Sequence, residues 1–157
     1  MRLFFASWPP GEAAEALARW AREAQRACGG RVVRKDAIHL TLAFLGDADP
    51  DEARARARAV RVPGTTLHIE RARYWAHNRI VWVGPACTPP ALANLARELG
   101  EARAYEAHVT LIRKARGGGR LPPVPAAEWP VREFVLVNST LSAEGSSYDV
   151  LGRYALA

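Results

Sequence analysis

A short pattern occurs twice in this chain and constrains both its secondary structure and its chemistry. The two copies are His39-Leu40-Thr41-Leu42 and His108-Val109-Thr110-Leu111. In each copy a histidine and a threonine alternate with apolar residues, which is the period of a β-strand with one buried face. We therefore expect two strands that each direct an imidazole and a hydroxyl to one side and pack apolar side chains in the core on the other.

Two such strands facing each other would surround a small anion with two imidazoles and two hydroxyls. One imidazole could act as a general acid and the other as a general base, while the hydroxyls donate hydrogen bonds to phosphate oxygens. This combination suits metal-free chemistry on a phosphate ester. A single His-x-Thr motif more often marks only a half-exposed strand without a function, because so short a motif carries little information. The repetition is what favours a shared site.

The composition indicates one globular domain. A chain of 157 residues with 49% hydrophobic and 24% charged residues can bury a core of its own and is not disordered. No apolar run is long enough to span a bilayer, and residues 1–9 are too short in their apolar part for a signal peptide, so we expect a cytoplasmic protein. Cys28 and Cys87 have no ligand-like spacing and are expected to be free thiols in a reducing compartment.

The charge is compatible with a polyanionic partner. The formal net charge is +6, and only Lys35 and Lys114 among the 22 basic residues are lysines. A positive surface attracts RNA. Many of the arginines lie among alanines, as in residues 53–58, and a bias in genome composition could produce that pattern. Charge alone therefore does not identify an RNA-binding protein.

Hydrophobic periodicity and turn residues predict the order of the elements. We expect helices that begin near Pro10, Asp49 and Thr88 and a loop over residues 117–125. We expect strands over residues 3–6, 31–34, 38–45, 65–75, 79–84, 107–113, 131–138 and 149–156.

In this order each His-x-Thr strand follows an amphipathic helix, which indicates a weak internal duplication. We expect an α+β fold of two lobes, whose antiparallel sheets face each other across a central cleft with the helices outside. The boundary between the halves would fall within residues 60–75.

The chain resembles the 2H phosphoesterase superfamily and, within it, the RNA 2',3'-cyclic phosphodiesterases, formerly named 2'-5' RNA ligases. The resemblance is nearly end to end. It is carried by residues 2–6, 38–46, 79–84, 108–113 and 134–139, which are similar to the first strand, the first signature, the middle strand, the second signature and the tail. One position departs from the family: Ala107 stands where a proline usually precedes the second histidine. Alanine can adopt the same extended backbone.

The resemblance implies a bilobal α+β fold over residues 1–157 with both motifs at its centre. It also implies hydrolysis of terminal RNA 2',3'-cyclic phosphates to 2'-phosphomonoesters, and in some members reversible 2'-5' joining of tRNA halves. The four histidines lack the spacings of a zinc site, so we expect neither a metal nor another cofactor. We also expect a monomer.

The resemblance assigns His39 to protonation of the leaving ribose oxygen and His108 to the attacking water, an order that the sequence itself leaves open. Thr41 and Thr110 would donate hydrogen bonds to the non-bridging oxygens of the phosphate. His68 and His77 are read as a solvent-facing strand residue and a turn residue, outside the catalytic set.

Two further residues are candidates for substrate binding. Arg113 could add a fixed positive charge, but it lies five residues after His108, and a regular strand would direct it to the opposite face. Its alternative is an ordinary surface arginine. Phe5 in the first strand could stack on a nucleobase, and its alternative is a place in the core.

The sequence is compatible with two other functions. The cleft could grip an RNA phosphate without catalysis, or it could act on a small cyclic nucleotide or an ADP-ribose cyclic phosphate instead of an RNA end. Turnover separates the first alternative from an enzyme. Comparison of mononucleotide and oligonucleotide substrates separates the second, because only the longer substrate makes several salt-sensitive backbone contacts.

Overall fold

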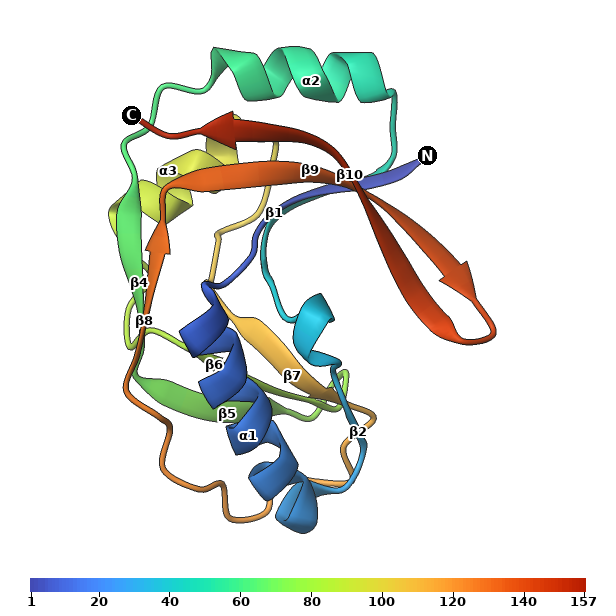
Figure 1. Ribbon diagram of the computed structural model, residues 1–157, viewed down its shortest axis with the longest axis vertical. Coiled ribbons are helices and arrows are strands. Elements are labelled where there is room, and N and C mark those ends of the chain that lie inside the picture. Colours follow the sequence, from blue (N-terminus) through green and yellow to red (C-terminus); the bar gives the residue numbers. More distant parts are fainter.

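The computed structural model describes all 157 residues and consists of three α-helices, one short 3-10 helix and ten strands (Figure 1). The helices are α1 (Gly11–Cys28), η1 (Lys35–Ala37), α2 (Pro50–Ala59) and α3 (Pro90–Glu98). The strands are β1 (Arg2–Ser7), β2 (Arg31–Val32), β3 (Leu40–Asp47), β4 (Thr65–Ile69), β5 (Arg71–Trp75), β6 (Ile80–Gly84), β7 (Val109–Arg113), β8 (Ala127–Val131), β9 (Glu133–Ser142) and β10 (Gly145–Ala155).

The strands form two four-stranded antiparallel sheets and one small two-stranded sheet. The order is β10-β9-β1-β3 in the first sheet and β2-β7-β6-β5 in the second, and β4 pairs with β8 in the third. The first His-x-Thr motif leads into β3, at the edge of the first sheet, and the second leads into β7, inside the second sheet. The predicted α+β class is confirmed.

The helices pack on the outer sides of the sheets. Helix α1 follows β1 of the first sheet but packs against β7 and β8, whereas α2 contacts β10 and α3 contacts β3. Figure 1 shows α1 lying across the second sheet, with α2 above β10. No helix is both long and apolar enough to cross a lipid bilayer. The first sheet takes β1 and β3 from one end of the chain and β9 and β10 from the other, so no single cut within residues 60–75 separates the two sheets.

The helix ends follow the expected signals. The side chain of Asp49 accepts a hydrogen bond of 3.2 Å from the backbone N–H of Asp51, and Pro50 occupies the first helical position of α2. Helix α1 ends at Gly29, whose φ of +65° is costly for residues with a Cβ atom. Its buried residues recur at helical spacing: Ala13, Leu17, Ala18, Trp20, Ala21, Ala24 and Cys28.

Two strand predictions need correction. Residues 65–75 are not one strand: the chain leaves the small sheet after Ile69 and joins the second sheet at Arg71. Between them, the carboxylate of Glu70 accepts a hydrogen bond of 2.9 Å from the backbone N–H of Ala86, which holds this corner. Strand β8 was missed, and only its last residue, Val131, falls within an expected strand. Pro130 is tolerated in β8 because each strand of a two-stranded sheet is an edge strand.

One core underlies both motif strands. The apolar residues Leu40 and Leu42 of β3 and Val109 and Leu111 of β7 are all fully buried in the same cluster. Burial of one face fixes which side chains of a strand can reach the other face. The shared core therefore determines where the polar residues of both motifs lie.

A matched pair of substitutions on β3 tests this placement. Leu40 is 0% exposed and Phe44 is 67% exposed. Leu40→Ala should lower the free energy of unfolding by about 2–5 kcal/mol because it leaves a cavity, whereas Phe44→Ala should change it by less than about 0.5 kcal/mol. Urea unfolding followed by circular dichroism measures both values. Equal losses would contradict the assigned faces of this strand.

Candidate active site

Both motif histidines line one cleft with a volume of about 650 Å³. Thr41 from β3 and Thr110 from β7 line the same cleft, and so does Arg113. The structure thus brings five of the six predicted site residues to one cavity between the two sheets. The residues come from distant parts of the sequence, and the two sheets hold them together.

Phe5 is the exception, and its predicted role in stacking is wrong. Its side chain is 0% exposed and packs edge to face against Phe134, with ring centroids 5.7 Å apart. A ring enclosed in the core cannot contact a base. Its neighbour Phe4 faces the other side of β1 and lines the cleft, as the alternation of a strand requires.

Arg113 reaches the cleft because β7 contains a bulge. Thr110 pairs with Trp82 and Ile112 pairs with Val81, so Leu111 has no partner of its own in β6. One extra residue reverses the alternation beyond it. Leu111 and Ile112 are accordingly both fully buried, and Arg113 lies on the same face as His108. In a regular strand, residues five apart lie on opposite faces. The bulge between His108 and Arg113 brings them to the same face.

The first motif has the same bulge at the same position. Ala43 pairs with Phe5 and Thr41 with Ala6, so Leu42, three residues after its histidine, is the extra residue. The residue five places after His39, Phe44, then lines the cleft as an exposed aromatic side chain. Phe44 was not among the residues expected in the site. Alignment of the two motifs, in which Phe44 takes the position of Arg113, is the sequence signal that could have found it.

Each histidine is oriented by a local hydrogen bond to the backbone. Nδ1 of His39 lies 2.8 Å from the carbonyl oxygen of Ala37, and Nδ1 of His108 lies 2.9 Å from the carbonyl oxygen of Glu106. A carbonyl oxygen can only accept, so Nδ1 carries the proton in both rings. The neutral form of each ring therefore has its lone pair on Nε2, the nitrogen left available to a ligand.

His39 is held among aromatic rings. Trp8 stacks on it with ring centroids 4.9 Å apart and an angle of 20° between the planes, and Phe4 and Tyr148 lie at 5.3 Å and 5.5 Å. Burial lowers the pKa of His39 from 6.5 to about 4, and the nearby positive charge of Arg113 adds to this effect. His39 is therefore neutral in the free protein at neutral pH.

His108 has a different aromatic surrounding. It contacts Trp75, with ring centroids 4.7 Å apart, and Trp82 at 6.0 Å. The two histidines thus share a backbone hydrogen-bond pattern but lie in different environments. Such a pair can divide the roles of proton acceptor and proton donor.

The other two histidines lie elsewhere. His68 is exposed on β4 and His77 lies in the turn after β5, and neither lines the cleft. No three or more histidine, cysteine, aspartate or glutamate side chains are grouped as a metal would require. The groups in the cleft that can bind or act on a phosphate include two imidazoles, the hydroxyls of Thr41, Thr110, Ser139, Ser146 and Tyr148, and the guanidinium groups of Arg2, Arg31 and Arg113.

Comparisons with known proteins agree with this geometry. Residues 8–82 match the family model described as LigT like Phosphoesterase. The chain is 35% identical to the RNA 2',3'-cyclic phosphodiesterase of Escherichia coli, over 99% of this chain and 96% of that relative. It is 30% identical to the RNA 2',3'-cyclic phosphodiesterase of Thermus thermophilus, over 99% of this chain and 90% of that relative.

Solved structures give the same result. The structure of Escherichia coli LigT complexed with 3'-AMP has a TM-score of 0.91 and 35% identity, and covers 99% of this chain and 97% of that one. LigT complexed with phosphate has a TM-score of 0.89 at 35% identity, with 99% and 96% covered. A Thermus thermophilus structure has a TM-score of 0.82 at 26% identity, with 99% and 98% covered. Through these likenesses along nearly its whole length, the chain belongs to the LigT-like phosphoesterase family.

Proposed function

We propose that this protein hydrolyses the 2',3'-cyclic phosphate at an RNA end to a 2'-phosphomonoester, with His39 and His108 as the acid-base pair. The observation that carries the proposal is the convergence of both histidines and both motif threonines on one cleft. The curated relatives in Escherichia coli and Thermus thermophilus are named for this activity.

The proposed reaction is a single displacement at phosphorus. A water molecule attacks the phosphorus atom, and one imidazole takes a proton from it as the new O–P bond forms. The other imidazole gives a proton to the ribose O3' as the P–O3' bond breaks. Thr41 and Thr110 donate hydrogen bonds to the non-bridging oxygens, and Arg113 stabilises the negative charge that develops on them.

The electrostatics of the free protein favour one division of roles. A histidine with a pKa of about 4 is neutral at pH 7 and can accept a proton, but it has none to donate from Nε2. This favours His39 as the base toward water and His108 as the acid toward O3', the reverse of the order that the family resemblance implies. The reverse order requires a bound phosphate to raise the pKa of His39 first.

The same site can join RNA ends. If the 5'-hydroxyl of a second RNA takes the place of water, the same proton transfers give a 2'-5' phosphodiester and a free 3'-hydroxyl. We extend the proposal to this reversible joining, with tRNA halves as candidate substrates.

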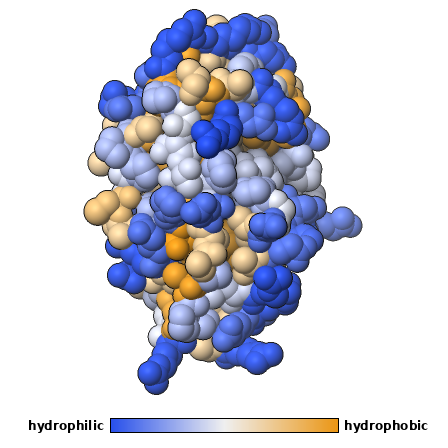
Figure 2. Space-filling view, turned by 60° about the vertical axis from the view of Figure 1, so that its left-hand side comes forward, coloured by the Kyte–Doolittle hydropathy of each residue, from blue (hydrophilic) through white to orange (hydrophobic).

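We also propose one domain of two pseudo-repeated lobes, acting as a monomer in the cytoplasm. The matching bulges at Leu42 and Leu111 support the repeat. The face of the molecule in Figure 2 is largely hydrophilic, with hydrophobic residues in small separate areas, which supports a monomer. Cys28 and Cys87 are both free, as expected in a reducing compartment.

Alanine substitution tests the catalytic pair. His39→Ala and His108→Ala should each lower kcat/KM on an RNA with a 2',3'-cyclic phosphate end by about 10²- to 10⁴-fold, because a proton transfer is lost. His68→Ala, which changes an exposed histidine outside the cleft, is the matched control and should keep the parent rate. A double His39/His108 alanine variant that still opens the cyclic phosphate at the parent rate would refute the proposal.

The pH dependence tests the role of His39. Its depressed pKa means that the neutral base is present above about pH 4 and is lost only as the pH falls through that value. The acidic limb of kcat/KM should therefore lie near pH 4. Trp8→Ala exposes the ring to water and should move that limb toward 6.5, the ordinary pKa of histidine. An acidic limb near 6.5 in the parent protein would show that His39 is not the base.

Metal independence is a separate expectation. After dialysis against EDTA, the rate on the cyclic phosphate should be unchanged, because the proposed steps use only imidazoles, hydroxyls and a guanidinium. A loss of activity that zinc or magnesium restores would require a different mechanism.

A further inference from the structure

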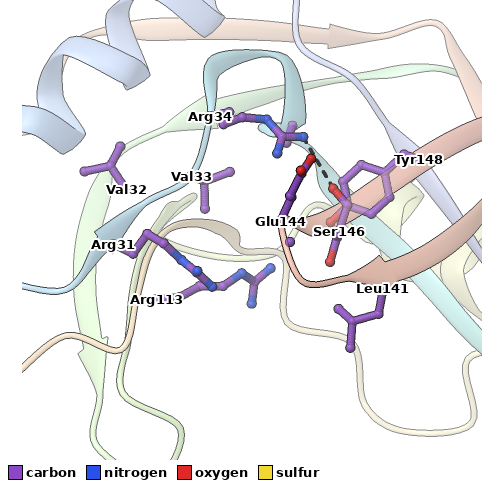
Figure 3. Close-up of a pocket in the computed structure, with 11 residues that line it drawn as sticks. Arg31, Val32, Val33, Arg34, Arg113, Leu141, Glu144, Ser146 and Tyr148 are labelled. Carbon is purple, nitrogen blue, oxygen red and sulfur yellow. Dashed lines mark hydrogen bonds between the residues drawn. The ribbon is translucent and has the colours of Figure 1, made fainter.

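A second cavity lies beside the histidine cleft and carries a cluster of arginines. Its volume is about 260 Å³, and Arg31, Arg34 and Arg113 line it (Figure 3). Arg31, Arg113 and Tyr148 line the histidine cleft as well, so the two cavities form one continuous groove. In the proposed reaction Arg113 lies at the reacting phosphate, whereas Arg31 and Arg34 take no part in it.

Two of these arginines are arranged in a way that folding alone does not favour. Arg31 of β2 is paired directly with Arg113 of β7 in the antiparallel register, and Figure 3 shows the two side chains next to each other. Like charges directly opposite each other on a sheet destabilise it. Neither arginine has an ion-pair partner within 4.0 Å. A second anion bound at Arg31, next to the phosphate at Arg113, would offset this repulsion.

Arg34 closes the cavity from the other side. Its guanidinium pairs with Asp36 at 3.2 Å and donates a hydrogen bond of 3.4 Å to the backbone carbonyl of Ser146, on the β9–β10 hairpin. Glu144 at the turn of that hairpin is the one carboxylate among the lining residues, and it forms no ion pair. The lining therefore has three guanidinium groups, of which Arg34 is paired with Asp36, against the one carboxylate of Glu144, so the cavity favours an anion.

The position of the cavity identifies the anion. Guanidinium groups match the oxygen pairs of a phosphate with two parallel hydrogen bonds. If the histidine cleft holds the terminal cyclic phosphate, a continuous groove leads the rest of the substrate to the next phosphate along the chain. For an RNA with a cyclic 3' end, that is the phosphodiester on the 5' side of the terminal nucleoside.

We propose that Arg31 and Arg34 form a binding site for this internucleotide phosphate, so that the protein acts on oligonucleotide ends in preference to cyclic mononucleotides. The inference rests on the proposed function, because it takes the histidine cleft as the site of the terminal phosphate. It adds two residues that determine specificity without taking part in the proton transfers.

Two substrates test the site: a nucleoside 2',3'-cyclic phosphate, and a dinucleotide that ends in the same nucleoside 2',3'-cyclic phosphate. The parent protein should have a kcat/KM about 10- to 100-fold higher on the dinucleotide, the range that charge-assisted hydrogen bonds give. Arg31→Ala and Arg34→Ala should each lose part of this advantage, and the double variant all of it. On the mononucleotide, which lacks the internucleotide phosphate, Arg34→Ala should stay within about twofold of the parent, because Arg34 does not line the histidine cleft.

Controls separate the site from general charge and from folding. Arg22→Ala removes one exposed positive charge from α1, outside both cavities, and should keep the full dinucleotide advantage. A circular dichroism spectrum like that of the parent shows that each variant is folded. Arg34→Lys, which keeps the charge but loses the two-pronged geometry, should recover only part of the advantage.

The failures are distinguishable. If the parent protein turns over neither substrate, the proposed function itself fails. If it turns over both with equal kcat/KM, or if the double variant keeps the full dinucleotide advantage, the arginine site is refuted and the proposed function stands. A mononucleotide with a 5'-phosphate that is preferred over the dinucleotide would also refute the oligonucleotide assignment, in favour of a small phosphorylated nucleotide.

Discussion

The buried faces of the two motif strands determine where the reactive groups lie. Leu40 and Leu42 on one strand and Val109 and Leu111 on the other are fully enclosed in one core that both sheets share. A strand whose apolar face is fixed has no freedom in the direction of its polar face. The imidazoles and hydroxyls are therefore positioned by the packing of the leucines and the valine on the opposite face of each strand. No flexible loop is needed to hold these four side chains.

Matching irregularities complete the site on both sides. In each motif strand the residue three places after the histidine is an extra residue in the ladder, and the residue five places after it is turned into the cleft. One strand thereby presents an apolar ring, Phe44, to the cleft, and the other presents a positive charge, Arg113. The environments of the histidines differ in the same way, since Trp8 stacks on His39 whereas Trp75 meets His108 edge on. The two motif strands thus have the same backbone irregularity but place their histidines in different chemical environments.

Most of the fold and the centre of the site could be predicted from the sequence. Alternation with a period of two predicted the motif strands, and helical spacing together with the cap at Asp49 predicted the helices. The repeated His-x-Thr pattern predicted four of the residues that line the cleft. The bulges could not be predicted, because they depend on the pairing partners, and for that reason the direction of Arg113 stayed open. Phe5 was misassigned because a strand that is buried on both faces shows no alternation in its sequence. The pairing of Arg31 with Arg113 depends on contact between strands far apart in the chain, which no local pattern shows.

The proposed reaction requires two imidazoles to act on one phosphorus atom from opposite sides, with O3' as the leaving group. The most direct test is product analysis of an oligonucleotide with a 2',3'-cyclic phosphate end, hydrolysed in water enriched in oxygen-18. Attack of water on phosphorus should give a 2'-phosphomonoester as the only product, with one labelled oxygen on phosphorus and none on the ribose. A 3'-phosphomonoester, or label in the ribose hydroxyl, would contradict it.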